Sequence, residues 1–181
     1  MFHFNTELLI DYWRGRRGSA ELPDRTAIDP ADFACLLPQV FIAVREAEGV
    51  YRFRLAGELL IDLHGRHLRG ENLLSLWSRT DRFEMISALE SSLRAAQPLV
   101  IGAHARADGS LTAGMEILFA PLAGPQGQAD RFLGLYQPTA RLAGLRGLVV
   151  HELTVRSING GEPRLAAPRL RLAALDGRRI A

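Results

Sequence analysis

The stretch 52–77, RFRLAGELLIDLHGRHLRGENLLSLW, constrains the fold more than any other part of the chain. The stretch begins within a strand, because Tyr51, Phe53 and Leu55 alternate with arginines. Such alternation is typical of a strand with one apolar face and one charged face. The sequence therefore predicts that this stretch begins on the surface of a sheet.

Several very short helices follow this strand. The strand ends at Ala56-Gly57, and the next apolar residues have helical spacing up to Gly65, where a left-handed residue would close the helix. A basic turn, Gly70 and an apolar cluster ending in Trp77 come next. A strand that passes directly into short helices predicts that the helices pack across the sheet and leave a hollow between the two layers.

The remaining pattern predicts an α+β fold. A helix with Phe83, Ile86, Leu89 and Leu93 facing the sheet is expected between a cap at Ser78 or Thr80 and Pro98. The economical arrangement is a five-stranded antiparallel sheet, with the short helices and this one long helix across one face, plus an N-terminal helix. The five strands are expected at residues 40–44, 51–55, 99–106, 111–122 and 132–137.

The stretch 52–77, which we call the organising stretch, resembles the corresponding part of PAS domains. It most resembles a bacterial PAS subfamily of largely unknown function, whose members carry "AG…L…L.GR.L.G…L.LW" here. The resemblance implies a sheet in which the first strand is central and pairs with the last, and often a dimer formed through an N-terminal helix. The matching residues are Ala56-Gly57, Leu60, Leu63, Gly65-Arg66, Leu68, Gly70, Leu74, Leu76 and Trp77.

An amphipathic helix is expected from Asn5 or Thr6 to about Arg17, before the PAS-like part. Its apolar stripe has to cover either the chain's own sheet or the same helix of a second subunit. The residue pattern leaves the two options open, and the resemblance adds weight to a homodimer. The candidate interface residues are Leu8, Leu9, Tyr12 and Trp13.

The chain of 181 residues is expected to form one domain with a tail. We divide it into a helical cap at 1–37, a PAS-like core at 38–140 and an extension at 141–181. Within the extension, 147–158 has a strand-like apolar pattern and 169–172 alternates. An extra hairpin packed on the domain and an arginine-bearing docking tail both fit this pattern, and we favour the hairpin.

The charge pattern argues against nucleic-acid and membrane partners. All 22 basic residues are arginines, but they are spread along the chain and the net charge is only +2. No run of apolar residues reaches the length of a membrane span. The N-terminus places Glu7 and Asp11 among apolar residues and has no preceding basic region, unlike a signal peptide. We therefore expect a cytoplasmic protein.

No cofactor or metal is predicted. The single cysteine, Cys35, lies outside any Asn-Cys-Arg-Phe-Leu motif, which light-sensing PAS domains use to hold flavin, so we expect a small buried core residue. Haem-binding PAS domains commonly take a histidine from the long helix, and residues 78–97 contain none. His64 and His67 are three residues apart, but Gly65 interrupts the helix and no cysteine completes a metal site. His104 is expected at the surface of its strand.

The glycines of the organising stretch are predicted to have a structural role. Gly57, Gly65 and Gly70 are too widely spaced for a dinucleotide-binding loop and instead separate the short helices. Arg66 is expected to anchor this segment through a carboxylate or through carbonyls at a helix end. No motif for a catalytic serine, a phosphate loop or a zinc protease is present, so the protein is not expected to be an enzyme.

The predicted hollow leads to two hypotheses for function. The first is a non-enzymatic PAS-type signalling module that acts through protein–protein contacts with an unidentified signalling protein, as a dimer. The alternative is a sensor that binds a small apolar molecule in the hollow, and a third, weaker reading is an arginine-dependent nucleic-acid binder. The hollow residues would line a ligand cavity or fill one another as core: Phe53, Leu60, Leu63, Trp77, Phe83, Met115, Phe119 and Tyr136.

Overall fold

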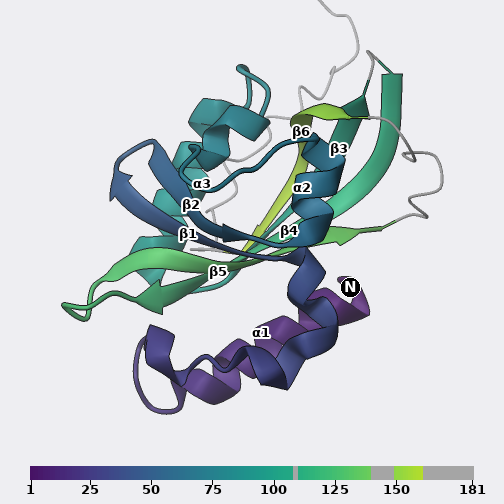
Figure 1. Cartoon of the computed structure of the whole chain (residues 1–181). Coiled ribbons are helices and arrows are strands. Elements are labelled where there is room, and N and C mark those ends of the chain that lie inside the picture. Colours follow the sequence, from purple (N-terminus) through teal and green to yellow (C-terminus); the bar gives the residue numbers. More distant parts are fainter. Residues whose placement is uncertain (108–109, 140–148, 161–181) are drawn as a thin grey trace, which may run out of the picture.

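One antiparallel sheet separates two layers of helices (Figure 1). A computed structural model describes residues 1–107, 110–139 and 149–160 of the chain. The sheet strands in these ranges are β1 (Val40–Ala47), β2 (Val50–Ala56), β3 (Leu99–Ala107), β4 (Ser110–Ala123), β5 (Ala129–Pro138) and β6 (Val150–Gly160). The α-helices are α1 (Phe4–Arg17), α2 (Glu58–His64) and α3 (Arg82–Ala95), and the 3₁₀ helices are η1 (Arg25–Ala27), η2 (Pro30–Gln39) and η3 (Leu73–Leu76).

The strand order is β2-β1-β5-β4-β3-β6, with neighbouring strands antiparallel. β1 lies inside the sheet, next to the edge strand β2, and it pairs with the last strand of the expected core, since Phe41 is opposite Gly134 on β5. This confirms the pairing of the first strand with the last core strand that the resemblance implied. The expectation of five strands is wrong, because β6 adds a sixth strand along the free edge of β3. The second arm of the predicted hairpin lies outside the described residues.

The sheet is buried on both faces by separate clusters of apolar side chains. On the face covered by α2, η3 and α3, Phe41 and Ala43 of β1 belong to the larger cluster. On the other face, Val40 of β1 packs in a second cluster with residues of α1 and η2. The first strand is therefore covered on both sides, which agrees with its continuous apolar sequence from Val40 to Val44.

The stripe of α1 covers the chain's own sheet. Leu9 and Trp13 are fully buried in the second cluster, and the Trp13 indole Nε1 donates a hydrogen bond of 2.6 Å to the carbonyl of Pro121 on β4. Leu8 and Tyr12 are partly buried against the same cluster. The prediction that Leu9 and Trp13 form a dimer interface is therefore wrong, because a partner cannot reach side chains that lie inside this core.

The buried face of α3 differs from the expected one. Met85 and Leu89 are fully buried, whereas Phe83 is 84% exposed. Successive residues of an α-helix are about 100° apart, so Phe83 and Met85 point in nearly opposite directions. The prediction that Phe83 faces the sheet is wrong, although Ile86 is partly buried there as expected. The expectation that this helix is the one long helix of the fold is not met either, since α3 and α1 have 14 residues each.

A β-bulge at Arg54 changes the direction of the side chains on β2. Phe53 is opposite Ala43 of β1, but Leu55 is opposite Ile42, so Arg54 is the extra residue. An extra residue breaks the alternation, so Leu55 leaves the apolar face that it was expected to share with Phe53. Leu55 is 49% exposed.

The segment around Cys35 is a 3₁₀ helix. Asp29 caps it, because its carboxylate accepts a hydrogen bond of 2.9 Å from the amide of Ala31. Phe33 and Leu36 turn inward, and Cys35 between them is exposed. The expectation that Cys35 is a buried core residue is therefore wrong.

The three glycines of the organising stretch are required for two different structural reasons. Gly65 ends α2 with a φ of 62°, the left-handed conformation that was predicted, and Gly70 has a φ of 84°. Gly57 instead allows two stretches of backbone to approach. A Cβ atom there would lie 2.3 Å from the carbonyl oxygen of Pro38, and the Gly57 amide donates a 2.8 Å hydrogen bond to Val40.

Replacing Gly57 by alanine should lower the free energy of unfolding by about 1–3 kcal/mol, because the new methyl group forces the backbone at Pro38 to move. The matched control is Gly15→Ala on α1, where a Cβ atom has no neighbour within 4 Å. The control should raise stability by about 0.5–1 kcal/mol, since alanine favours a helix over glycine. Urea unfolding followed by circular dichroism measures both changes. A Gly57→Ala variant as stable as the wild type would show that this close approach does not occur.

Candidate functional site

The hollow between the sheet and the short helices is filled by side chains. Five of the residues predicted to lie in it do line it: Phe53, Leu60, Trp77, Phe119 and Tyr136. Leu63 and Met115 are buried in the same cluster without lining it. Sequence analysis did not place the other lining residues there; they are Phe41, Leu73, Leu76, Ile117 and Leu153.

Aromatic rings occupy the centre of this hollow. Phe41 packs edge-to-face against Phe53 and Phe119, with ring centroids 5.6 Å apart in each pair. Gly134 on β5 makes room for the Phe41 ring, since a Cβ atom at Gly134 would lie 2.0 Å from it. The remaining cavity has a volume of about 10 Å³. That is room for about one water molecule, far below the roughly 300–1,000 Å³ of ordinary ligand pockets.

A buried histidine connects α2 to two strands at the wall of the hollow. The Nδ1 atom of His64 lies 3.0 Å from the carbonyl oxygen of Val150 on β6, and its Nε2 atom lies 3.1 Å from the hydroxyl of Tyr136 on β5. A carbonyl only accepts hydrogen bonds, so Nδ1 carries the proton and donates it. Nε2 is then the acceptor for the Tyr136 hydroxyl. In the neutral imidazole, both ring nitrogens and the proton of the Tyr136 hydroxyl are satisfied together. Protonation would make Nε2 a second donor, and the Tyr136 hydroxyl proton would lose this acceptor.

Burial favours this neutral form. It lowers the pKa of His64 to about 4, against a partial opposing effect of the hydrogen bond to Val150, and the nearby Arg66 guanidinium lowers it further. Burial also raises the pKa of the Tyr136 hydroxyl. His64 is not among the site residues predicted from the sequence. The sequence signal that could have identified His64 as buried is its position four residues after Leu60, which places both residues on one face of a helix.

The last described strand, β6, closes the hollow. Leu153 lines it, and the carbonyl of Leu153 accepts a 2.8 Å hydrogen bond from the amide of Ser78, just after Trp77. The amide of Val155 donates a 2.9 Å hydrogen bond to the carboxylate of Asp81, next to the start of α3. Hydrogen bonds therefore join β6 to the residues that lead from Trp77 into α3.

A second polar cluster fixes α3 to the other end of the sheet. The carboxylate of Glu90 accepts hydrogen bonds of 2.6 Å from the Tyr51 hydroxyl and from the Arg45 guanidinium. Burial alone would raise the pKa of Glu90, but these two hydrogen bonds outweigh it and the pKa is lowered. Burial, followed by the bond to Glu90, raises the pKa of Tyr51. The cluster is a structural tie between β1, β2 and α3.

Arg66 has the carboxylate partner that was expected. Its guanidinium lies 3.0 Å from the carboxylate of Glu71, and half of the arginine side chain is exposed. Exposed ion pairs stabilise proteins by about 0–1 kcal/mol. Arg66 therefore steadies the turn after α2 without being essential to the fold.

The other candidate ligands lie apart from one another. His104 is partly exposed on β3, as expected, and its ring contacts Arg156 of β6. Within the described ranges, no three histidine, cysteine, aspartate or glutamate side chains are grouped closely enough to hold a metal ion. In the same ranges, no helix is both long and apolar enough to cross a membrane.

Comparison with known proteins agrees with this architecture. A sequence model of the family described as "PAS domain" matches residues 1–137. The chain belongs to the PAS domain family. PAS domains are generally sensory rather than catalytic, and this chain is a PAS-type signalling module. The matched region takes in α1 and ends at residue 137, within β5, so β6 lies beyond it. The division into cap, core and extension stays a prediction.

Solved PAS and light-oxygen-voltage (LOV) structures resemble this PAS domain at low identity. A Rhodobacter sphaeroides LOV protein is 15% identical, with a TM-score of 0.47, and the match covers 64% of this chain and 71% of that one. The PAS domain of a Colwellia psychrerythraea protein is 17% identical, with a TM-score of 0.43, covering 61% and 97%. A LOV domain studied with a flavin analogue is 15% identical, with a TM-score of 0.48, covering 61% and 84%. No curated protein sequence matches the chain.

Proposed function

We propose that this PAS domain transmits its signal through contacts with another protein, without catalysing a reaction and without a small molecule in its hollow. The observation that supports the proposal is the filled interior: a cavity of about 10 Å³ surrounded by aromatic and aliphatic side chains. If the interior holds no ligand, the domain receives and passes on its signal through its outer surface.

The proposal includes the absence of haem and flavin. Either ring system needs a pocket of several hundred Å³, whereas Phe41, Phe53 and Phe119 occupy that space here. Cys35 lies on the exposed side of η2, before the first strand, so it does not face the hollow. The residues present do not fit either cofactor.

The proposed partner is a protein, not a nucleic acid or a membrane. Many arginines of the described surface are already paired with carboxylates, for example Arg16 with Asp32, Arg52 with Glu46 and Arg106 with Glu152. If two copies of the chain associate, they use a surface other than Leu9 and Trp13, which are inside the core.

Native mass spectrometry of the purified protein tests the empty hollow and reports the number of chains together. We expect the mass of the 20.0 kDa polypeptide, or a whole multiple of it, without a co-purified small molecule. A small apolar probe such as indole should leave the melting temperature of the wild type unchanged.

The control for this experiment is Trp77→Ala, which removes a side chain that lines the hollow. The resulting apolar cavity should accept indole, as engineered apolar cavities do, and indole should raise the melting temperature of the variant. A tightly bound small molecule in the wild type, or a clear rise of its melting temperature with indole, would contradict the proposal and favour the alternative, a sensor with an apolar ligand.

A further inference from the structure

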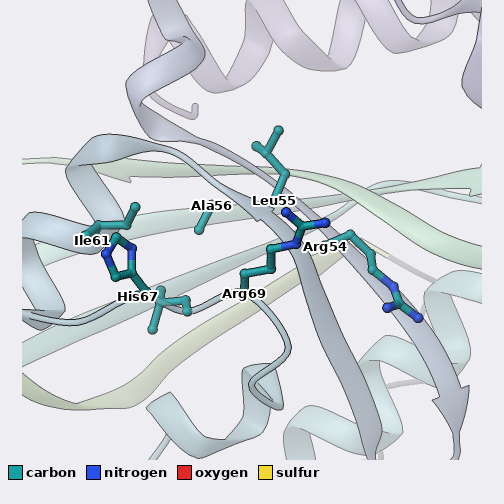
Figure 2. A pocket seen from close by; sticks show the side chains of 7 residues that line it. Arg54, Leu55, Ala56, Ile61, His67 and Arg69 are labelled. Atoms are coloured by element: carbon teal, nitrogen blue, oxygen red, sulfur yellow. The ribbon is translucent and has the colours of Figure 1, made fainter.

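Two grooves meet at Leu55 on the edge strand β2. The first has a volume of about 390 Å³ and is lined by Arg25, Ile42, Val44, Arg54, Leu55 and Arg131. The second has a volume of about 280 Å³ and shares Arg54 and Leu55. It adds Ala56, Ile61, His67, Leu68 and Arg69 (Figure 2). We call these lining residues together the Leu55 surface. It lies outside the filled hollow and belongs to none of the sites described above.

The rim of the Leu55 surface is cationic. No aspartate or glutamate lines either groove within the described ranges. Arg131 is largely neutralised by the adjacent Asp130 at 2.7 Å, and Arg54 shares Glu46 with another arginine. In the same ranges, Arg25 and Arg69 have no ion-pair partner. Figure 2 shows Arg69, from the turn after α2, beside Leu55 and Arg54 of β2, and His67 from the same turn beside Ile61.

The floor of the Leu55 surface is apolar. Ile42 and Val44 of β1 are only partly buried, and Leu55 beside them is 49% exposed. They lie on the face of the sheet that α1 covers farther along, where α1 packs on β4 and β5. The bulge at Arg54 turns Leu55 onto this face, and bulges commonly redirect a side chain next to a functional site. Without the bulge Leu55 would face the core.

A partner at this surface binds through side chains and not as an added strand. The free edge of β2 is already occupied, because the amide of Phe53 donates to the carbonyl of Glu71 at 3.0 Å and the carbonyl of Phe53 accepts from Gly70 at 2.8 Å. The amide of Tyr51 donates to the side chain of Asn72 at 3.1 Å. The backbone groups that β-augmentation needs are therefore taken at these positions.

We propose that the Leu55 surface is the docking site for an acidic segment of a partner protein that carries an apolar anchor residue. Carboxylates of the segment would pair with Arg25, Arg54 and Arg69, and the anchor would cover Leu55 and the neighbouring floor. The proposal rests on the proposed function, signalling through protein contacts, and names the chemistry of the partner.

Charge and composition separate this occupant from two others. In a two-fold dimer centred on this surface, arginines of one copy would face arginines of the other, which is unfavourable. Single-stranded nucleic acid is bound by aromatic platforms on which bases stack. Apart from His67, the residues that line the two grooves are aliphatic residues and arginines. No phenylalanine, tyrosine or tryptophan is among them.

Fluorescence anisotropy with a short labelled peptide tests the proposal. The probe alternates glutamate and leucine, and a peptide with lysine in place of glutamate is the comparison. We expect the acidic peptide to bind the full chain, more weakly as salt rises from about 50 to about 300 mM, because exposed charges are screened. The Arg25→Glu, Leu55→Ser double variant should bind about tenfold more weakly or worse, the loss typical of important interface residues.

The matched control is the Arg94→Glu, Phe83→Ser double variant. It makes the same kinds of change at an exposed arginine and at an exposed apolar residue of α3. Its affinity should equal that of the wild type, and circular dichroism should give the same melting curve for both double variants. Equal loss in the two double variants, or equal binding of the lysine peptide, would overturn the proposal.

Two further outcomes would also overturn it. They are tighter binding of a single-stranded oligonucleotide than of the acidic peptide, and no binding of the peptide at concentrations up to about 1 mM. Neither outcome concerns the hollow. If the peptide fails while native mass spectrometry finds no small molecule, this proposal falls and the proposed function stands.

Discussion

Replacing Trp77 by alanine is expected to lower the free energy of unfolding by about 3–5 kcal/mol, the usual loss when a buried tryptophan or phenylalanine is truncated. Trp77 is 2% exposed and lies where η3 ends, against Leu153 of β6. Removing the indole opens a space that the aromatic rings around it cannot close without moving. Urea unfolding at neutral pH, followed by circular dichroism, measures the loss.

The control is Phe83→Ala on α3. Phe83 was expected to belong to the same interior, but its side chain is 84% exposed. Its truncation should change stability by less than about 0.5 kcal/mol, as is usual for surface substitutions. A loss at Phe83 as large as the loss at Trp77 would mean that α3 packs with a different face on the sheet.

The second expected result is a loss of stability in acid that is caused by His64. Burial lowers the pKa of His64 in the folded protein to about 4, from 6.5. Below pH 6.5 the unfolded chain takes up a proton at this position, and the folded chain does so only near pH 4. The uptake favours unfolding, so stability falls progressively between these two values and is unaffected above them. The full effect is roughly 3 kcal/mol, at 1.36 kcal/mol for each pKa unit.

The His64→Gln variant isolates this effect, because carboxylates elsewhere also destabilise the protein in acid. The difference in unfolding free energy between wild type and variant, measured by urea unfolding from pH 7 to pH 4.5, should shrink as the pH falls. Parallel pH profiles would refute the assignment. Nitrogen chemical shifts provide an independent check, since at pH 7 the imidazole should carry its proton on Nδ1, the atom that donates to Val150.

The positions of β1 and β2 were the most predictable features of the fold, whereas the order of the strands came from the resemblance and their number was wrong. Alternating residues located β2, and the continuous apolar run at Val40 located a strand covered on both faces. Gly65 was identified correctly because only a few residues tolerate the left-handed conformation that ends a helix. These features depend on neighbouring residues, which a sequence displays directly.

The orientation of α3 could not be derived in the same way. Phe83 and Met85 are both apolar, and helical periodicity gives the spacing of a stripe but not which of two overlapping stripes faces the sheet. The stripe of α1 posed a similar problem. Its pattern showed that something covers Leu9 and Trp13, but only the folded chain shows that the cover is the second face of the same sheet.

The two least predictable residues are the ones with the most specific roles here. The outward turn of Leu55 depends on a bulge, which has no signal in the residues around Arg54. The role of His64 depends on two partners, Tyr136 and Val150, that are far away in the sequence. Its apolar-face position was visible, but its hydrogen bonds were not.

The sixth strand has a practical consequence for work with fragments of this protein. The family match ends at residue 137, before β6 begins at Val150. A fragment cut at that boundary would expose the whole hydrogen-bonding edge of β3, from Leu99 to Ala107, and bare sheet edges of this length promote aggregation. It would also lose Leu153 and the acceptor of His64, leaving the interior open to solvent. Expression trials should therefore retain the chain through Gly160.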